Sequence, residues 1–327
     1  MSPSPESSAP TNSPGDASLP SGTSIIDLNF LGCREAVGLY LLEGGGELAL
    51  VDSGPSSCLP VLRDNLATRG LTLNDISTLL LTHIHFDHAG AAGTLVKENP
   101  RLRVYVHEIG AVHLEDPSRL LKSARRLYGD ALHKMFGEFL SVPAENINVL
   151  TGGESFRAAG REIETAYTPG HASHHVSYFD QSTGAAFTGD TTGFRLPGYK
   201  VVGPITPPPD VDLAAWTNSL AEIERRNPSR LLLPHFGAFS NVKEHLQATR
   251  EGLYAWTERA WNVIKNTPDE SARVSAFTAL AEEEFRHQLP DAESAARYIT
   301  VGMPPLSWYG LERYWRKRIE VQQQNLA

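Results

Sequence analysis

The folded part of the chain begins with short apolar runs. They occupy residues 25–30, 37–42 and 48–52, and three glycines at 44–46 separate the last two runs. Runs of this length bounded by turn residues are typical of β-strands joined by tight connections. A segment with helical spacing follows at 59–67. The pattern therefore predicts an α/β fold in which two sheets pack together and helices cover them outside.

A long stretch of helical pattern then interrupts the strands. Residues 108–140 carry leucine, methionine and phenylalanine at helical spacings, between strands predicted at 103–107 and 147–149. We interpret this stretch as an inserted helical lid or cap. Strands resume at 163–167, at 176–179 and before Asp190, and a helix is predicted at 213–225.

Beyond Gly237 the pattern is almost wholly helical. Helices are predicted at 242–265, 271–287, 292–299 and 306–323. The chain begins instead with a stretch rich in serine, proline and glycine, which has neither a core-forming segment nor the apolar centre of a secretory signal. We therefore predict three parts: a disordered tail at 1–22, a sheet-containing domain at 23–238 and a helical C-terminal subdomain at 239–327.

Composition narrows the class of protein. A chain of 327 residues that is 41% hydrophobic can bury a large core. Its net charge of -9 and the lack of a dense basic run, apart from 313–318, argue against nucleic acid as a partner. No window is apolar enough to predict a membrane span.

Cys33 and Cys58 form neither a disulfide framework nor a metal-binding pair. We expect a cytoplasmic protein with a small-molecule substrate; a homo-oligomer is left open.

The candidate chemistry lies directly after an apolar run at 76–81. His83, His85, Asp87 and His88 follow within a few positions. Alternate side chains of an extended chain point the same way, so His83 and His85 share one side, whereas Asp87 and His88 begin the next turn and can face a second metal. Imidazole and carboxylate ligands suit zinc, iron or manganese, and zinc is the default for a set rich in histidine.

This motif, His-x-His-x-Asp-His, resembles the signature of the metallo-β-lactamase-fold hydrolases. Four further segments match the pattern of that family in order: Val51-Asp52-Ser53-Gly54, Thr168-Pro169-Gly170-His171, Phe187-Thr188-Gly189-Asp190 and Leu233-Pro234-His235. The resemblance implies a four-layered αββα sandwich, to which this chain adds a helical insertion at about 108–140 and an all-helical C-terminal extension.

The resemblance also implies a site for two divalent metal ions. Its ligands would be His83, His85 and His171 for one metal, Asp87, His88 and His235 for the other, and Asp190 as a bridge. Asp52 and His175 match positions that orient such ligands from behind. A hydroxide that bridges the metals would attack the substrate carbonyl, and Asp87 is the candidate catalytic residue that takes up a proton.

Departures from individual branches of the family narrow the activity. Asp190 stands where the true β-lactamases have cysteine, and His85 stands where the redox-active di-iron branch has glutamate. The glyoxalase II branch, which hydrolyses glutathione thioesters, shares all seven ligand positions, although its basic glutathione-binding cluster is not found here. We therefore predict a glyoxalase-II-like hydrolase of a thioester, a lactone or a related ester. Two alternatives stay open: a phosphodiesterase of a small substrate and a mononuclear-iron persulfide-type dioxygenase.

Some residues outside the motifs are weighed as well. The loop at 191–210 is predicted to form a wall for the substrate. On it, Arg195 or Lys200 could bind an anion, although a solvated charge is the favoured interpretation. Trp308 and Tyr309 are kept as candidates for the substrate entrance. Three single histidines lack paired spacing and are not expected among the ligands: His107, His113 and His133.

Overall fold

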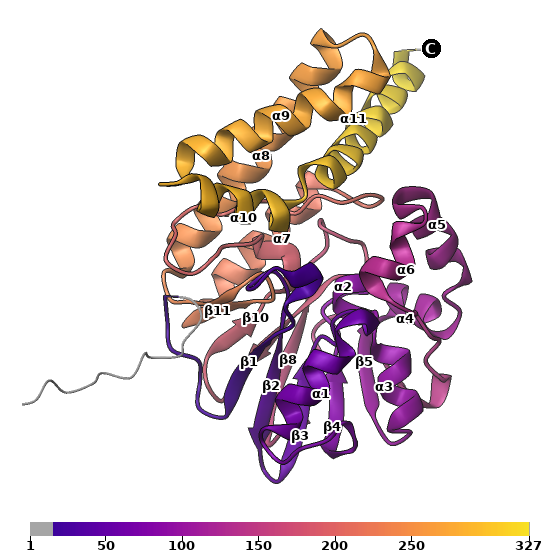
Figure 1. Ribbon diagram of the computed structural model, residues 1–327, viewed down its shortest axis with the longest axis vertical. Coiled ribbons are helices and arrows are strands. Elements are labelled where there is room, and N and C mark those ends of the chain that lie inside the picture. The colour runs from indigo at the N-terminus through magenta and orange to yellow at the C-terminus, as the bar shows by residue number, and fades with distance from the viewer. Residues whose placement is uncertain (1–15, 327) are drawn as a thin grey trace, which may run out of the picture.

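Two six-stranded sheets packed face to face form the centre of the molecule, with helices outside them (Figure 1). The computed structural model describes residues 16–326. In spatial order the first sheet contains β1 (Thr23–Asp27), β2 (Gly38–Gly44), β3 (Glu47–Val51), β4 (Ile76–Leu80), β5 (Arg103–His107) and β6 (Ile147–Leu150). The second contains β12 (Gly237–Phe239), β11 (Arg230–Leu233), β10 (Ala185–Phe187), β9 (Val176–Asp180), β8 (Arg161–Tyr167) and β7 (Ser155–Ala158). The predicted αββα sandwich is confirmed.

Strands of the sandwich are continuous apolar runs because both faces of each sheet are buried. In β2, Leu39 and Leu41 pack toward the helices outside the first sheet, whereas Tyr40 and Leu42 point into the layer between the sheets. Because successive side chains point to opposite faces of the sheet, one strand contributes apolar side chains to two layers of the core. A third layer lies between the second sheet and the C-terminal helices.

Helices of the first half cover the first sheet. They are α1 (Leu59–Ala67), α2 (Phe86–Ala89) and α3 (Ala92–Glu98). The insertion follows β5 as three helices, α4 (Glu108–Glu115), α5 (Ser118–Tyr128) and α6 (Ala131–Phe136). The single long helical stretch predicted there is therefore divided. Pro117 cannot continue a helix and Gly129 adopts a positive φ of 54°, so each ends the helical turn before it.

The C-terminal helices pack on the other side of the sandwich. They are α7 (Leu213–Arg226), α8 (Val242–Asn266), α9 (Glu270–Gln288), α10 (Ala292–Gly302) and α11 (Pro304–Leu326). Buried aromatic side chains hold them together, among them Trp256, Phe277, Phe285 and Trp308. None of the helices within residues 16–326 is long and apolar enough to cross a membrane.

Two strands were not predicted, β7 and β12. Each lies at an edge of the second sheet, where one neighbouring strand supplies the pairing partners. Arg157 interrupts the apolar pattern of β7, and Gly237 begins the three-residue β12. Strands of three or four residues are too short to show a clear alternating pattern, although each pairs with a strand next to it in the chain.

The predicted disordered tail at 1–22 lies partly outside the described residues, since the structure describes the chain from 16 onward. From 16 to 22 the prediction is wrong. The backbone N–H of Ala17 donates to the Ala238 carbonyl at 3.0 Å, and the Arg161 guanidinium donates to the Ser21 carbonyl at 2.8 Å. This segment is ordered by partners more than a hundred residues away, so its own composition gives no sign of it.

Candidate metal centre

Loops that follow strands bring the predicted ligands together. His83, His85, Asp87 and His88 follow β4, whereas Asp190 and His235 follow β10 and β11. The last two strands are parallel neighbours, so their carboxyl ends meet at the same edge. His171 comes from the loop between β8 and β9. The seven residues His83, His85, Asp87, His88, His171, Asp190 and His235 are called the cluster below.

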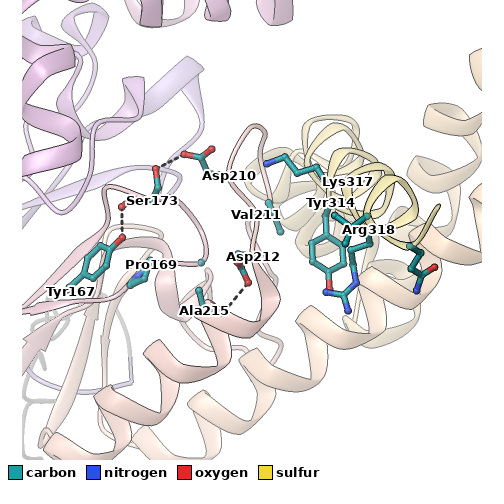
Figure 2. A pocket seen from close by; sticks show the side chains of 13 residues that line it. Tyr167, Pro169, Ser173, Asp210, Val211, Asp212, Ala215, Tyr314, Lys317 and Arg318 are labelled. Carbon is teal, nitrogen blue, oxygen red and sulfur yellow. Dashed lines mark hydrogen bonds between the residues drawn. The ribbon is translucent and has the colours of Figure 1, made fainter. Parts of the chain in front are cut away.

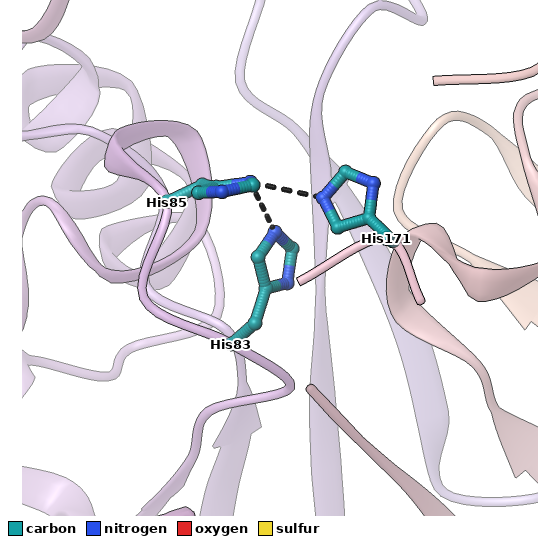
Figure 3. A group of neighbouring side chains, drawn as sticks. All are labelled: His83, His85 and His171. Carbon is teal, nitrogen blue, oxygen red and sulfur yellow. Dashed lines mark hydrogen bonds between the residues drawn. The ribbon is translucent and has the colours of Figure 1, made fainter. Parts of the chain in front are cut away.

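Three histidines of the cluster form one group (Figure 3). The Nδ1 atom of His85 lies 3.0 Å from Nε2 of His83 and 2.9 Å from Nε2 of His171. All three imidazoles point toward one another from two different loops, so their nitrogens can bind a single ion.

A second group consists of Asp87, His88 and His235. The Nε2 atoms of the two imidazoles are 3.3 Å apart. Oδ2 of Asp87 lies 3.5 Å from the first of these nitrogens and 3.6 Å from the second. Four ligands held in a tetrahedron about 2.1 Å from a metal are about 3.4 Å apart, so these spacings suit such an ion.

Asp190 faces both groups with different oxygens. Its Oδ2 lies 3.4 Å from Nε2 of His171 and 4.0 Å from Nε2 of His83. Its Oδ1 lies 3.3 Å from Nε2 of His88 and 3.4 Å from Nε2 of His235. The carboxylate is therefore placed to be shared by two ions.

Hydrogen bonds at the Nδ1 atoms of His88 and His235 determine which nitrogen of each neutral ring carries the lone pair. Nδ1 of His235 donates to the Ala36 carbonyl at 2.5 Å, and Nδ1 of His88 donates to Asp52 at 2.9 Å. When both rings are neutral, as metal ligands must be, the facing Nε2 atoms both present lone pairs that a cation between them would accept. Among the described residues, the buried Oδ1 of Asp190 has no hydrogen-bond partner. Together with Oδ2 of Asp87, four ligand atoms therefore converge on one point. This arrangement fits a metal ion, because a proton can join only two of these atoms.

Asp52, directly after β3, connects Thr82 and His88 in the loop after β4. Its carboxylate accepts from the backbone N–H of Thr82 at 2.8 Å, from the Thr82 hydroxyl at 3.0 Å and from Nδ1 of His88. The residue adopts a positive φ of 62° and is buried. This is the arrangement expected of a residue that orients a metal ligand through the far side of its ring.

We predict that Asp52→Asn weakens metal binding by about 10- to 100-fold. Asparagine removes the negative charge and one acceptor behind His88, which loosens the ring and lowers its basicity. Competition with a chromogenic chelator would measure the affinity. Asp64→Asn, an exposed carboxylate of α1, is the matched control. Equal affinities in the two variants would show that Asp52 does not tune the site.

His175 supports Asp190 from the protein side. Its Nε2 accepts the backbone N–H of Asp190 at 3.1 Å, while Nδ1 lies 3.0 Å from the Thr168 hydroxyl and 3.1 Å from the Thr191 hydroxyl. The side chain is fully buried and contributes no atom to either group of ligands. The predicted orienting position is therefore occupied by a ring that holds the backbone of Asp190.

A glycine next to His171 permits the loop to pack closely. Gly170 has a φ of 130°, and a Cβ there would lie 2.3 Å from Cα of Trp216. The indole of Trp216 in turn packs edge-on against the His171 ring, with centroids 5.6 Å apart. The turn thus places His171 through a contact that only glycine allows.

Electrostatic surroundings differ between the two groups. Burial lowers the pKa of His83 well below 6.5, and burial together with the neighbouring His171 lowers the pKa of His85 to about 3. These rings are neutral at pH 7, as metal ligands must be. Burial also opposes a charge on His88, but the Asp190 and Asp87 carboxylates outweigh it and raise its pKa well above 6.5. The Asp190 and Asp87 carboxylates therefore favour positive charge at the second group.

The cluster opens into a cavity of about 450 Å³, called the cluster cavity below. Four members of the cluster line it: His85, Asp87, Asp190 and His235. The other walls come from the insertion, from the proline-rich segment 205–210 and from the junction of α10 and α11. The prediction of a wall within 191–210 agrees with this placement. A volume of this size is typical of small-molecule sites.

A neighbouring cavity of about 630 Å³ lies between the loop at 210–212 and α11 (Figure 2). No residue of the cluster lines it. The two cavities share Ser173 and Asp210, whose side chains are joined by a hydrogen bond of 2.6 Å. Lys317 and Arg318 lie on the α11 side of this second space.

Several residues weighed from the sequence lie elsewhere. Arg195 is buried, donates to the Tyr199 carbonyl at 2.6 Å and pairs with Asp16. The favoured interpretation as a solvated charge is therefore wrong, and the side chain is not available to an anionic ligand either. Lys200 is exposed and lines neither cavity. Trp308 is buried in the helical core, and the half-exposed Tyr309 does not line the cluster cavity. The single histidines His107, His113 and His133 lie outside both ligand groups, although His113 lines the cluster cavity.

Sequence reasoning missed two residues beside the cluster. His174 lies in the cavity wall, accepts the backbone N–H of Ile84 at 3.3 Å and has its ring centroid 5.5 Å from that of His85. Its position next to His175 was the available signal. Tyr128 of α5 also lines the cavity, and burial followed by the charge of Asp87 raises the pKa of its phenol. Nothing in the local sequence places this residue at the site.

Comparisons with known proteins identify one family. The family model described as the metallo-beta-lactamase superfamily matches residues 37–235. A metallo-beta-lactamase fold-containing protein of Sulfurisphaera tokodaii is 28% identical over 218 residues, which cover 65% of this chain and 78% of that protein. An atrochrysone carboxyl ACP thioesterase of Aspergillus fumigatus is 28% identical over 211 residues, 64% of this chain and 53% of the fungal protein. The matched part thus spans about half the length of the fungal relative.

Solved structures extend the similarity of fold. A metallo-beta-lactamase family protein of Thermus thermophilus superposes with a TM-score of 0.61 at 24% identity, covering 91% of this chain and 94% of that chain. The archaeal protein from Sulfolobus tokodaii superposes with a TM-score of 0.57 at 25% identity, covering 72% of this chain and 86% of that chain. The superposition on the Thermus protein includes 91% of this chain, which is more than the residues 37–235 matched by the family model. The fold shared with that protein therefore extends beyond the matched region.

Proposed function

Because the chain belongs to the metallo-beta-lactamase superfamily, we propose that it is a hydrolase that uses two divalent metal ions to cleave a thioester or a related ester. One observation carries the proposal: the Nε2 atoms of His88 and His235 lie 3.3 Å apart, and Oδ1 of Asp190 lies 3.3 and 3.4 Å from them, beside a small-molecule cavity. The named thioesterase among the relatives supports the choice of substrate.

The residues have distinct tasks in this proposal. His83, His85 and His171 hold one ion, Asp87, His88 and His235 hold the other, and Asp190 is shared. When bound, the two ions supply a water that ionises near neutral pH and a positive charge that polarises the scissile carbonyl. Zinc is the proposed metal because five of the seven ligands are imidazoles, with iron and manganese as alternatives.

Asp87 is the proposed proton acceptor. Its side chain is 26% exposed and lines the cluster cavity, so a reacting group can approach it. Burial alone would raise the pKa of this carboxyl, but His88 and His235 outweigh it and lower the pKa to about 2. The carboxylate is therefore ionised at neutral pH, as both metal binding and proton uptake at its oxygen require.

Metal content and substrate preference test the proposal together. Protein purified without added metal should contain about two equivalents of zinc per chain by elemental analysis. It should cleave N-acetylcysteamine thioesters or lactones faster than the phosphodiester bis(p-nitrophenyl) phosphate. About one iron per chain, together with oxygen uptake on persulfides and no ester cleavage, would contradict the proposal in favour of the dioxygenase. Preferential cleavage of the phosphodiester would contradict the choice of substrate.

A further inference from the structure

Three arginines line the same cavity as the cluster. Arg119 and Arg126 belong to α5, and Arg313 belongs to α11. All three side chains are exposed. They come from the insertion and from the C-terminal helices. Cationic residues of two separate elements therefore line one space.

These arginines are available to bind a ligand. Within residues 16–326, neither Arg119 nor Arg126 lies within ion-pair distance of a carboxylate, and α5 contains four cationic residues without an acidic one. Arg313 donates from Nε to the Pro209 carbonyl at 3.1 Å, which leaves its two terminal nitrogens free of side-chain partners among the described residues. Apart from the cluster, the cavity has one lining carboxylate, Asp210, which accepts the Ser173 hydroxyl. The balance of charge beyond the cluster is positive.

The remaining wall of the cavity is mostly apolar. Representative side chains are Ile84, Phe86, Leu127, Phe136, Met303 and Leu306. A ligand that matches this space must combine a sizeable apolar group with several anionic oxygens. Small polar esters would leave the apolar wall exposed to water, which is unfavourable.

We propose that the substrate is an acyl thioester whose apolar acyl group packs against this wall and whose thiol carrier bears phosphate groups bound by Arg119, Arg126 and Arg313. This inference rests on the proposed function. In the reaction, water forms the new C–O bond, the C–S bond breaks, and the products are a carboxylic acid and the free thiol of the carrier. The step is a hydrolysis and needs no oxidant or reductant.

Spacing favours phosphate groups over a single carboxylate. Arg119 and Arg126 are seven residues apart, which is two helical turns or about 10 Å along one side of α5. One carboxylate cannot bridge that distance while also reaching Arg313. Several phosphates along a carrier can, and guanidinium groups bind phosphate oxygens in pairs. The carrier can be coenzyme A or the phosphopantetheine arm of a carrier protein, which share this chemistry.

Selectivity between two carriers of the same acyl group tests the inference. The measured quantity is kcat/KM for decanoyl-coenzyme A divided by kcat/KM for decanoyl-N-acetylcysteamine, which has no phosphate. We expect Arg119→Gln, Arg126→Gln and Arg313→Gln each to lower this ratio by about tenfold or more, because each removes a charged hydrogen bond. Matched controls are Arg125→Gln, which lines a different cavity beside α6, and Lys317→Gln in the neighbouring cavity; neither should change the ratio.

A binding measurement separates this inference from the proposed hydrolase. S-methyl-coenzyme A cannot be hydrolysed, and its affinity can be measured by calorimetry in every variant. Weaker binding in the three arginine variants and not in the controls supports the phosphate site even if no thioester is cleaved. An unchanged ratio and unchanged affinity in an enzyme that cleaves thioesters would overturn the inference and leave the hydrolase intact. Preference for S-lactoylglutathione over decanoyl-coenzyme A would overturn it as well.

The same variants distinguish the two sources of the carrier. Arg125 is an exposed cation of α5 outside the cluster cavity, so with a decanoyl carrier protein as substrate it tests whether a protein docks on this helix. A loss of rate in Arg125→Gln with the carrier protein, but not with coenzyme A, supports a protein-bound carrier. If both substrates lose rate only in the Arg119, Arg126 and Arg313 variants, and Arg125→Gln cleaves both at the normal rate, the free coenzyme is the supported carrier.

Discussion

Replacing Asp190 by asparagine is expected to lower kcat/KM for a thioester by at least about a hundredfold, the upper end of the loss for a residue that only supports a ligand. The carboxylate faces both ligand groups, with Oδ2 3.4 Å from His171 and Oδ1 3.3 Å from His88. Asparagine removes its charge and turns one oxygen into an amide nitrogen that cannot bind a metal. We expect bound metal to fall from about two equivalents to one or fewer, measured by elemental analysis after dialysis.

A control separates this loss from a general effect on the protein. Glu115→Gln makes the same carboxylate-to-amide change at an exposed residue of α4 and should keep both activity and metal content. The unfolding of both variants should remain cooperative. If the Asp190 variant keeps two metals and full activity, the shared carboxylate is not part of the site.

Removing metal with a chelator is expected to abolish hydrolysis and to lower the free energy of unfolding by about 4 kcal/mol, the linkage value when free metal exceeds its dissociation constant a thousandfold. Without a cation, the facing nitrogens of His88 and His235 at 3.3 Å and the buried Oδ1 of Asp190 lose the group that satisfies them. Chemical denaturation before and after chelation measures the change. Adding back zinc should restore both stability and activity.

The Asp190 variant also serves as the control for this measurement. Because it binds less metal, chelation should shift its stability by less than that of the unaltered protein. Identical unfolding curves for the unaltered protein before and after complete removal of metal would contradict a metal site inside the cluster.

The position of the cluster explains why substitutions far apart in the sequence should act together. Its ligands come from loops after β4, β8, β10 and β11, which belong to two different sheets. Interactions behind the ligands connect the same loops: Asp52 joins β3 to His88, and His175 joins the loop after β8 to Asp190. Loosening one of these contacts should change metal binding more than it changes overall stability.

The sequence by itself determined the sandwich and the identity of the residues that come together in the cluster. Strands buried on both faces need continuous apolar runs, so the runs at 37–42 and 76–81 were visible without any structure. The ligands lie in short segments directly after such runs, and the types and order of residues in these segments carry the chemistry. Local signals of this kind do not depend on distant parts of the chain.

Tertiary structure alone decided what surrounds the cluster. In the sequence Arg195 is a loop cation that could bind an anion, but Asp16 from the start of the described chain engages it. Arg119 and Arg313 are ordinary surface cations in the sequence, yet folding places both at one cavity. Residues 16–22 likewise owe their order to partners far away, among them Ala238 and Arg161. The physical reason is the same in each case: these contacts join segments separated by a hundred residues or more, and their energies depend on where the whole fold places them.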